Sequence, residues 1–256
     1  MLASIGFDSQ MRSAPLITDL DGFAARTEAF RLLRTNLQFI DLDHHPHCLV
    51  VTSSVPGEGK TTTATNLAVA LAQTGRKILI VDADLRKPRV ASTLGLDAAV
   101  GLTTALVGRA ELHETIQVHE ASGLHVLASG AKPPNPTEIL QSRVTSDLIG
   151  RLRPSYDMII IDAPPLLPVA DAAVLSRLAD GVILLVRHGK TTRDQVEESV
   201  NRLRQVGGRL YGVVVNMVAQ RAISSYYYYY EETGKYSGRS SSAAQAKKAA
   251  KERKKK

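Results

Sequence analysis

The residues best suited to chemistry begin in a glycine-containing stretch, residues 51–62, with the sequence VTSSVPGEGKTT. An apolar run precedes it and a helical pattern follows it, the setting in which backbone N–H groups and a helix N-terminus hold a phosphate. There the ammonium group of Lys60 would reach the β- and γ-phosphates of a nucleotide, and the Thr61 hydroxyl would bind Mg²⁺. Ser54 replaces the first glycine of the usual G-x-x-x-x-G-K-[ST] pattern, a loss for which Gly57 partly compensates. The stretch therefore predicts a phosphate-binding loop; the alternative is a Gly-Glu-Gly turn that only precedes a helix.

Two further segments supply carboxylates. Asp82 and Asp84 follow the apolar run 78–81 and, being two residues apart, would point the same way from the end of an extended strand. Two such carboxylates tolerate each other best beside a metal ion or another cation. Asp162 follows the apolar run 158–161, at the end of a strand where ligands bind in open parallel sheets, and its oxygens suit Mg²⁺. The alternative for the first pair is an acidic exit from a strand, which is common in α/β folds.

The elements that must position these residues alternate as in a parallel sheet flanked by helices. Continuous apolar runs, rather than alternating ones, indicate strands that are buried on both faces. Helical patterns lie between the runs, over residues 60–74, which end at Gly75, and over residues 192–206, which end at Gly207. We therefore predict an α/β fold with a doubly wound, mostly parallel sheet flanked by helices. The predicted strands are 49–52, 78–81, 124–127, 158–161, 182–186 and 210–215.

The domain organisation follows from where this pattern starts and stops. Residues 1–22 mix Gly, Ser, Pro and Asp without a sustained period and predict an N-terminal arm or linker. The α/β pattern covers residues 23–221. Residues 222–256 predict a disordered tail that contains a tyrosine cluster at 226–236 and a polybasic end at 247–256.

Composition excludes several classes of protein. With 256 residues, 44% hydrophobic and 22% charged, the chain is not collagen-like, not a disulfide framework and not wholly disordered. A lone Cys48 cannot form an internal disulfide, which fits a reducing compartment. We see neither a run of about 18 uncharged apolar residues nor a signal peptide. The net charge of +7 comes from residues 235–256, which hold nine basic residues and one acidic residue, so a uniformly basic, nucleic-acid-binding surface has no support.

Six of the eight tyrosines follow the last predicted strand. A core strand would mix aliphatic with polar residues, whereas these phenols are flanked by Ser, Glu and Gly, which favours an exposed segment. An exposed segment could serve as a flexible substrate that reaches a neighbouring subunit. The alternative is an aromatic edge strand or an interaction patch. The six residues are Tyr226, Tyr227, Tyr228, Tyr229, Tyr230 and Tyr236.

Residues 49–62, 78–88 and 158–165 together resemble the Walker A, Walker A′ and Walker B motifs of bacterial tyrosine kinases. These P-loop enzymes autophosphorylate a C-terminal tyrosine cluster and control capsular or exopolysaccharide production. Related partitioning and division-site ATPases usually carry an additional lysine near the start of the phosphate loop, where this chain has Ser53 and Ser54. The resemblance extends over about residues 23–236, and its motifs lie at 49–62, 78–88, 130–138, 158–165 and 212–216.

The resemblance implies a protein-tyrosine kinase that uses ATP and Mg²⁺. Lys60 would stabilise the transferring phosphoryl group, Thr61 and Asp84 would bind Mg²⁺, and Asp162 would complete the metal shell. Asp82 would take the tyrosine proton or orient the phenol; a carboxylate of pKa about 4 is a weak base against a phenol of pKa about 10, which favours orientation. The implied ATP-binding residues are Gly57, Glu58, Gly59, Lys60, Thr61 and Thr62, with Asn216 at the adenine. An asparagine at a strand end also forms turns, so this last role has an alternative.

A predicted helix carries a possible subunit contact. Its apolar stripe is Phe30, Leu33, Leu37 and Ile40. On an adjoining face, Glu28, Arg31 and Arg34 match the E-x-x-R-x-x-R element through which family members form a ring-like homo-oligomer and phosphorylate one another in trans. The alternative is a solvated face with a Glu28–Arg31 pair worth a few tenths of a kcal/mol.

The resemblance implies further partners and a location. Family members are activated by a cytoplasmic segment of a membrane adaptor, or polysaccharide co-polymerase, and act in the cytoplasm at the inner face of the plasma membrane. The N-terminal arm resembles the segment after the second membrane helix of fused members, so the chain could be the cytoplasmic part of a two-span membrane protein. The Lys-rich end could bind an anionic membrane surface; no specific nucleic acid is expected.

Other functions remain open from the sequence alone. The runner-up is a ParA/MinD-like switch ATPase that acts as a positioning or scaffold protein without tyrosine phosphorylation. A third class is a polyanion-binding module that depends on the Lys-rich tail. His44, His45 and His47 lie in a Pro-containing turn without a fourth ligand, and we expect a polar loop there rather than a metal site.

Overall fold

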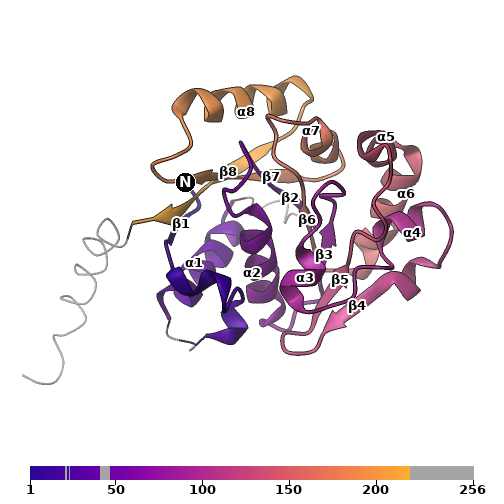
Figure 1. Ribbon diagram of the computed structural model, residues 1–256, viewed down its shortest axis with the longest axis horizontal. Helices are drawn as coiled ribbons and strands as arrows, with labels where there is room; N and C mark the ends of the chain where they lie inside the picture. The colour runs from indigo at the N-terminus through magenta and orange to yellow at the C-terminus, as the bar shows by residue number, and fades with distance from the viewer. Residues whose placement is uncertain (21, 23, 41–46, 220–256) are drawn as a thin grey trace, which may run out of the picture. The chain divides into compact units, whose positions relative to one another are not determined.

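The computed structural model describes residues 1–20, 22, 24–40 and 47–219 (Figure 1). Within this part of the chain, eight strands form one sheet in the order β1-β8-β7-β2-β6-β3-β5-β4. All neighbouring strands are parallel except β4 and β5. The strands are β1 (Ala3–Gly6), β2 (Cys48–Ser53), β3 (Ile78–Asp82), β4 (Ile116–His119), β5 (Leu124–Leu127), β6 (Met158–Asp162), β7 (Gly181–Arg187) and β8 (Leu210–Val218). The predicted doubly wound, mostly parallel α/β fold is confirmed.

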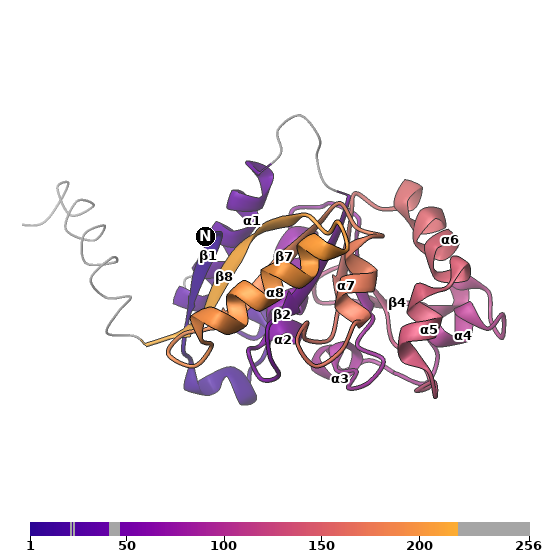
Figure 2. The ribbon, with the colours of Figure 1, turned by 90° about the horizontal axis from the view of Figure 1, so that it is seen from above.

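Helices cover both faces of the sheet. Alternate residues of the central strands point to opposite sides, so that Leu49 and Val51 belong to one apolar core while Val50 belongs to the other. The first core includes residues of α1 (Ala25–Gln38), α2 (Lys60–Ala72) and α3 (Val90–Leu94). The second includes residues of α4 (Leu102–Leu106), α5 (Pro136–Gln141), α6 (Arg143–Leu152), α7 (Asp171–Ser176) and α8 (Arg193–Gln205). Figure 1 shows α8 above the sheet and α1, α2 and α3 below it, and Figure 2 shows α4, α5 and α6 gathered at the β4 end.

Short 3₁₀ turns complete the described chain, at Ser9–Arg12, Ile17–Asp19, Leu112–Thr115 and Arg153–Ser155. The helices predicted over residues 60–74 and 192–206 are found with ends shifted by at most two residues. Helix α2 begins directly after Gly59, whose φ of +87° an L side chain rarely adopts, and α8 begins at a capping box formed by Thr192 and Gln195. Helix α1 ends at Gln38, so the half-buried Ile40 lies beyond the helix and packs against the first core from the following segment.

Residues 1–22, for which the sequence predicts an arm or linker, contribute a strand and buried side chains to the fold. Strand β1 pairs with β8 in parallel and forms one edge of the sheet, and Leu2, Ile5 and Ile17 are buried in the first core. The side chain of Asn66 in α2 accepts the backbone N–H of Ile17 at 2.7 Å and donates to the carbonyl of Pro15 at 2.9 Å. A strand of four residues is too short to show a period, and its partner strand lies about two hundred residues further along the chain.

Other predictions fall outside what the structure describes. These are the tail 222–256 with its tyrosine cluster and polybasic end, and the histidines at positions 44 and 45. No helix among the described residues is long and apolar enough to cross a bilayer.

Candidate functional site

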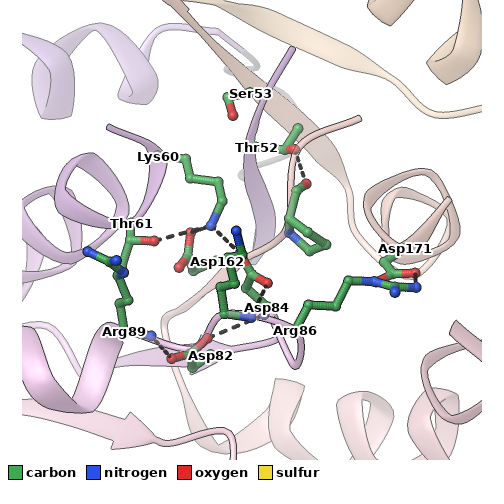
Figure 3. A network of polar contacts seen from close by, with 12 residues as sticks. Thr52, Ser53, Lys60, Thr61, Asp82, Asp84, Arg86, Arg89, Asp162 and Asp171 are labelled. Carbon is green, nitrogen blue, oxygen red and sulfur yellow. Dashed lines mark hydrogen bonds and ion pairs between the residues drawn. The ribbon is translucent and has the colours of Figure 1, made fainter. Parts of the chain in front are cut away.

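Three neighbouring strands bring the predicted site residues together at their carboxyl ends. Strand β6 lies between β2 and β3, and Asp162 at its end is in register with both Val51 of β2 and Asp82 of β3. Because the carboxyl ends of parallel strands lie on the same side of the sheet, Asp162 is flanked by the phosphate loop after β2 and by the loop after β3. We call this second loop, residues 83–89, the acidic loop. Figure 3 shows Lys60 and Asp84 converging on this point.

Lys60 is the centre of the cluster. Its Nζ lies 2.6 Å from Asp84 Oδ2, 3.7 Å from Asp162 Oδ1 and 3.2 Å from Thr61 Oγ1, as Figure 3 shows. Burial lowers the pKa of Lys60, but attraction to Asp162 and Asp84 outweighs burial and raises the pKa above its usual value. The ammonium group is therefore charged at neutral pH and is positioned to meet an anionic ligand.

Asp162 is a buried carboxylate without a hydrogen bond. Its side chain is 0% exposed, and neither oxygen accepts a hydrogen bond from the described residues. Burial raises its pKa to about 6, while the nearby charge of Lys60 and the hydroxyl of Thr61 act in the opposite direction. A buried carboxylate that has an ion pair but no hydrogen bond is costly, which suits a group that binds a further cation.

The residues present fit Mg²⁺. Among the described residues, no three His, Cys, Asp or Glu side chains are grouped closely enough to hold a metal ion by themselves. Mg²⁺ is usually held by one or two carboxylates together with water and substrate phosphates, rather than by a cage of protein ligands. The hydroxyl of Thr61 and the carboxylates of Asp84 and Asp162 supply such a partial set of hard oxygen ligands beside the phosphate loop.

Asp82 holds the acidic loop in place. Its Oδ2 accepts the backbone N–H groups of Arg89 and Val90, both at 2.9 Å, and its Oδ1 accepts the N–H of Asp84 at 3.3 Å. Burial, followed by the nearby charge of Asp162, raises the pKa of Asp82 to about 7. Because backbone groups engage both oxygens, the geometry favours a positioning role for Asp82 over direct proton transfer.

The phosphate loop is also held by the end of β7, by the segment that follows it and by β8. The Glu58 carboxylate accepts the N–H of Val55 at 2.9 Å and, through its other oxygen, contacts the Thr191 hydroxyl and the backbone N–H of Arg187. The Glu58 carbonyl accepts Asn216 Nδ2 at 2.8 Å. Through these contacts the Glu58 side chain braces the phosphate loop. Sequence reasoning missed Thr191 and Arg187, since nothing in their local sequence points to the loop.

Asn216 supports the same loop. Its Oδ1 accepts the N–H of Met217 at 2.8 Å, so both ends of its amide are engaged within the protein, and it is 3% exposed. A Cβ at Gly59 would lie 2.2 Å from Asn216 Nδ2, which explains why that position needs glycine. Met217 has a φ of +56°, in the left-handed region. The geometry thus ties Asn216 to the loop through one N–H and one oxygen lone pair of its amide, and the contact with adenine stays a prediction.

We expect Asn216→Ala to weaken the affinity for Mg-ATP and Mg-GTP equally, by about fivefold, because it removes a hydrogen bond worth about 1 kcal/mol. Titration calorimetry with both nucleotides measures this, with the exposed Asn201→Ala in α8 as the matched control. A loss of affinity for Mg-ATP alone would instead support a contact between Asn216 and adenine.

A second network fixes the acidic loop from the opposite side, as Figure 3 shows. Arg86 donates to the fully buried carboxylate of Asp171 at 2.7 and 3.2 Å and to the Thr137 hydroxyl at 2.9 Å. Thr137 also contacts Asp171. Thr137 belongs to the motif at 130–138, and Asp171 begins α7. Sequence reasoning missed the roles of all three residues, which lie far apart along the chain.

The loop after β6 closes the site. Arg202 of α8 donates to the carbonyls of Leu166 and Leu167 at 2.9 and 2.7 Å, while the N–H of Leu166 donates to the carbonyl of Ser53 at 2.8 Å. Together these segments enclose a pocket of about 420 Å³. Its lining includes the glycines and Lys60 of the phosphate loop, three cations of the acidic loop and an apolar wall after β6. These residues are Pro56, Gly57, Gly59, Lys60, Thr61, Thr62, Asp84, Arg86, Lys87, Arg89, Pro164, Pro165, Pro168 and Val169.

The three residues of the predicted subunit contact lie on α1 and make contacts within the chain. Glu28 and Arg31 form an ion pair in which both side chains are more than 40% exposed, and Arg31 also donates to the carbonyl of Gly22 at 2.9 Å. Arg34 donates to the carbonyl of Ala70 near the end of α2 at 2.9 Å. Arg34 therefore links two helices of the first core.

Comparison with known proteins identifies relatives of this chain. A family model described as an AAA domain matches residues 47–211. The chain is 42% identical to tyrosine-protein kinase YwqD of Bacillus subtilis over 74% of this chain and 80% of that protein. It is 38% identical to tyrosine-protein kinase CpsD of Streptococcus agalactiae over 78% of this chain and 85% of that protein. It is 36% identical to tyrosine-protein kinase etk of Escherichia coli K12 over 78% of this chain but only 27% of that longer protein.

Solved structures agree with these relatives. The chimerical protein CapA2B2 has a TM-score of 0.80 and 36% identity over 86% of this chain and 95% of its own. The kinase domain of Escherichia coli ETK has a TM-score of 0.80 and 31% identity over 86% and 91%. The septum site-determining protein MinD of Pyrococcus horikoshii, complexed with Mg-ADP, has a TM-score of 0.58 and 28% identity over 66% and 70%.

Proposed function

Because this chain belongs to the family of bacterial tyrosine-protein kinases, we propose that it transfers the γ-phosphate of ATP to tyrosines of its own C-terminal cluster, in trans between copies. One observation carries the proposal: Lys60, Thr61, Asp84 and Asp162 converge beside the phosphate loop, with both oxygens of the buried Asp162 left without a hydrogen bond. The acceptors are Tyr226–Tyr230 and Tyr236, which lie outside the described residues.

The residues of the site divide the work of phosphoryl transfer. In this reaction the bond between the γ-phosphorus and the bridging oxygen of ADP breaks while a bond to the phenol oxygen forms, and the phenol proton passes to solvent water. Catalysis of such a loose transition state is mostly positioning and charge neutralisation. Bound Mg²⁺ would supply neutralising charge to the phosphates, held by Thr61, Asp84 and Asp162.

Lys60 and the phosphate loop provide the rest. The loop presents backbone N–H groups, and Glu58 and Asn216 keep it in shape through their contacts with neighbouring segments. Lys60 lies where it can leave its carboxylate partners for the transferring phosphoryl group. Asp82 fixes the acidic loop through backbone hydrogen bonds, so that Asp84 keeps its position beside Lys60.

A homo-oligomer would bring the tail of one copy to the site of another. Helix α1 supports this proposal because two large apolar side chains, Leu32 in the helix and Phe39 directly after its last residue, are 54% and 66% exposed. They are seven residues apart and so lie on the same face of the helix turns. A ring-like assembly that uses this face, with Arg34 joining α1 to α2 behind it, is the arrangement that we propose.

The proposed setting is the inner face of the plasma membrane, where the kinase regulates capsular or exopolysaccharide synthesis or export. The relative etk is a longer protein, of which this chain matches 27%, so activation by a cytoplasmic segment of a membrane adaptor fits either a separate or a fused partner. The Lys-rich end would add attraction to anionic lipids.

Mapping of phosphate after incubation with Mg-ATP tests the proposal. The protein is first treated with a tyrosine phosphatase and then assayed at high concentration by peptide mass spectrometry. We expect phosphate on Tyr226–Tyr230 and Tyr236, and almost none in a variant with all six changed to Phe. The remaining tyrosines, Tyr156 and Tyr211, lie within the fold and serve as internal controls. Steady release of phosphate without phosphotyrosine would instead identify a switch ATPase, the class to which the resemblance to MinD points.

A further inference from the structure

Two cations in the wall of the pocket have no countercharge in the part of the chain that the structure describes. Lys87 and Arg89 line the pocket and are exposed. The neighbouring cations are already paired, Lys60 with Asp84 and Arg86 with Asp171. For Lys87 and Arg89, only the backbone N–H groups are bonded, and within the described residues their side chains contact no acceptor.

The side chain of Arg89 points into the site. Figure 3 shows it running from the acidic loop toward Thr61, at the beginning of α2. The pocket therefore presents positive charge next to the phosphate loop, beyond the charge of Lys60. Unpaired cations at the mouth of a site attract an anionic ligand and raise its local concentration.

The wall formed after β6 is apolar. It consists of Pro164, Pro165, Pro168 and Val169, which offer rigid surface without hydrogen-bond donors. Such a surface suits a flat aromatic ring, because packing of the ring fixes few side-chain torsion angles. The ligand that matches both walls is an aromatic group with acidic neighbours.

The tyrosine cluster has this chemistry at one end. Tyr230 is followed by Glu231 and Glu232, and no basic residue occurs between the first tyrosine of the cluster and Lys235. The two glutamates lie within about 7 Å of the Cα of Tyr230 along an extended chain. They are therefore close enough to contact cations in the same pocket as the phenol.

We propose that Lys87 and Arg89 determine peptide specificity by binding acidic residues that follow the acceptor tyrosine, so that the kinase selects Tyr-Glu-Glu sequences and phosphorylates Tyr230 first. The inference rests on the proposed function and names the substrate class of that site. Each phosphotyrosine adds about −1.5 to −2 charges, so phosphorylated Tyr230 then serves as the acidic neighbour for Tyr229. Phosphorylation proceeds toward the N-terminal end of the cluster.

Peptide kinetics test the proposal in the full chain with the six cluster tyrosines changed to Phe, so that only the added peptide accepts phosphate. The probes are SSYEETGK, which corresponds to residues 228–235 with two tyrosines replaced by serine, and SSYQQTGK. We expect the KM of the first peptide to be about tenfold lower, the effect of two exposed ion pairs of modest strength. Lys87→Met with Arg89→Met should remove this difference in KM between the two peptides.

Charge reversal gives the sharpest readout. Lys87→Glu with Arg89→Glu should lower the KM of SSYKKTGK below that of SSYEETGK, which a merely structural role would not produce. Arg109→Met, at an exposed site elsewhere, is the matched control. An increase in the KM for ATP, or equal changes for all peptides, would overturn the proposal and assign the two cations to the nucleotide. Failure of the proposed function looks different, because then no peptide is phosphorylated at all.

Discussion

Replacing Lys60 with methionine is expected to reduce phosphotyrosine formation by at least about 100-fold, the usual cost of removing a charged donor aimed at a transition state. The structure gives the reason. The ammonium group lies between Asp84 and Asp162 at the start of α2, and it is the cation closest to both carboxylates. Methionine keeps the apolar stem of the side chain but supplies no charge to the transferring phosphoryl group.

The control for this variant is Lys190→Met, which removes an exposed lysine after β7. Quantitative mass spectrometry of the tail peptides compares both variants with the unmodified protein. Thermal unfolding confirms that each variant is folded before activity is compared. Retention of more than about a tenth of the activity by the Lys60 variant would show that the charge of this residue is not used in the reaction.

The second large effect concerns Asp162, where activity and stability are expected to change in opposite directions. Asp162→Asn should lower phosphoryl transfer by about 100-fold because it removes a charged oxygen ligand at the metal position. The nucleotide-free protein should unfold at a temperature a few degrees higher. In the unmodified protein a carboxylate is fully buried without a hydrogen bond, and burial raises its pKa to about 6, whereas a neutral amide of the same shape avoids that cost. Lys60 keeps its closer partner Asp84 at 2.6 Å.

Calorimetric unfolding with and without Mg-ADP measures both halves of this prediction. The increase in unfolding temperature that Mg-ADP causes should be smaller in the variant than in the unmodified protein. Asp147→Asn, an exposed residue on α6, is the control and should change neither quantity. A variant that is less stable without nucleotide, or fully active, would contradict the assignment of Asp162 to a cation site.

Much of the site could be predicted from the sequence because its chemistry lies in contiguous motifs. The glycines and Lys60 follow one apolar run directly, and Asp82 and Asp162 end two others. A parallel sheet must bring such strand ends to one edge, so the motifs implied the cluster before its geometry was known. Four of the six predicted strands, β2, β3, β6 and β7, are short apolar runs that are almost wholly buried, and their length and flanking residues distinguish them from buried helices.

What escaped prediction depends on contacts between distant segments. Strand β1 is four residues long and pairs with β8, and β4 forms the opposite, antiparallel edge. The contact of Glu58 with Thr191 and that of Arg86 with Asp171 join residues 85 to 133 positions apart. No local pattern encodes such pairs, since each partner is an ordinary polar residue in its own segment.

Asp82 and Asn216 show a related limit. Their positions were predicted, but their hydrogen bonds were not, and those bonds favour a positioning role for each residue. Backbone N–H groups occupy the oxygens of Asp82, and the amide of Asn216 is shared between Glu58 and Met217. A residue type at a motif position therefore predicts proximity to the site more securely than it predicts the chemical task.

The central claim is that one copy of this chain transfers phosphate from ATP to the tyrosines of another. The most direct test mixes two variants: an isotope-labelled Lys60→Met chain, with an intact tail but no activity, and an unlabelled chain whose six cluster tyrosines are Phe. With Mg-ATP, phosphate is predicted to appear on Tyr226–Tyr230 and Tyr236 of the labelled chain, measured by mass spectrometry. A labelled chain that stays unmodified while ATP is hydrolysed would contradict the claim.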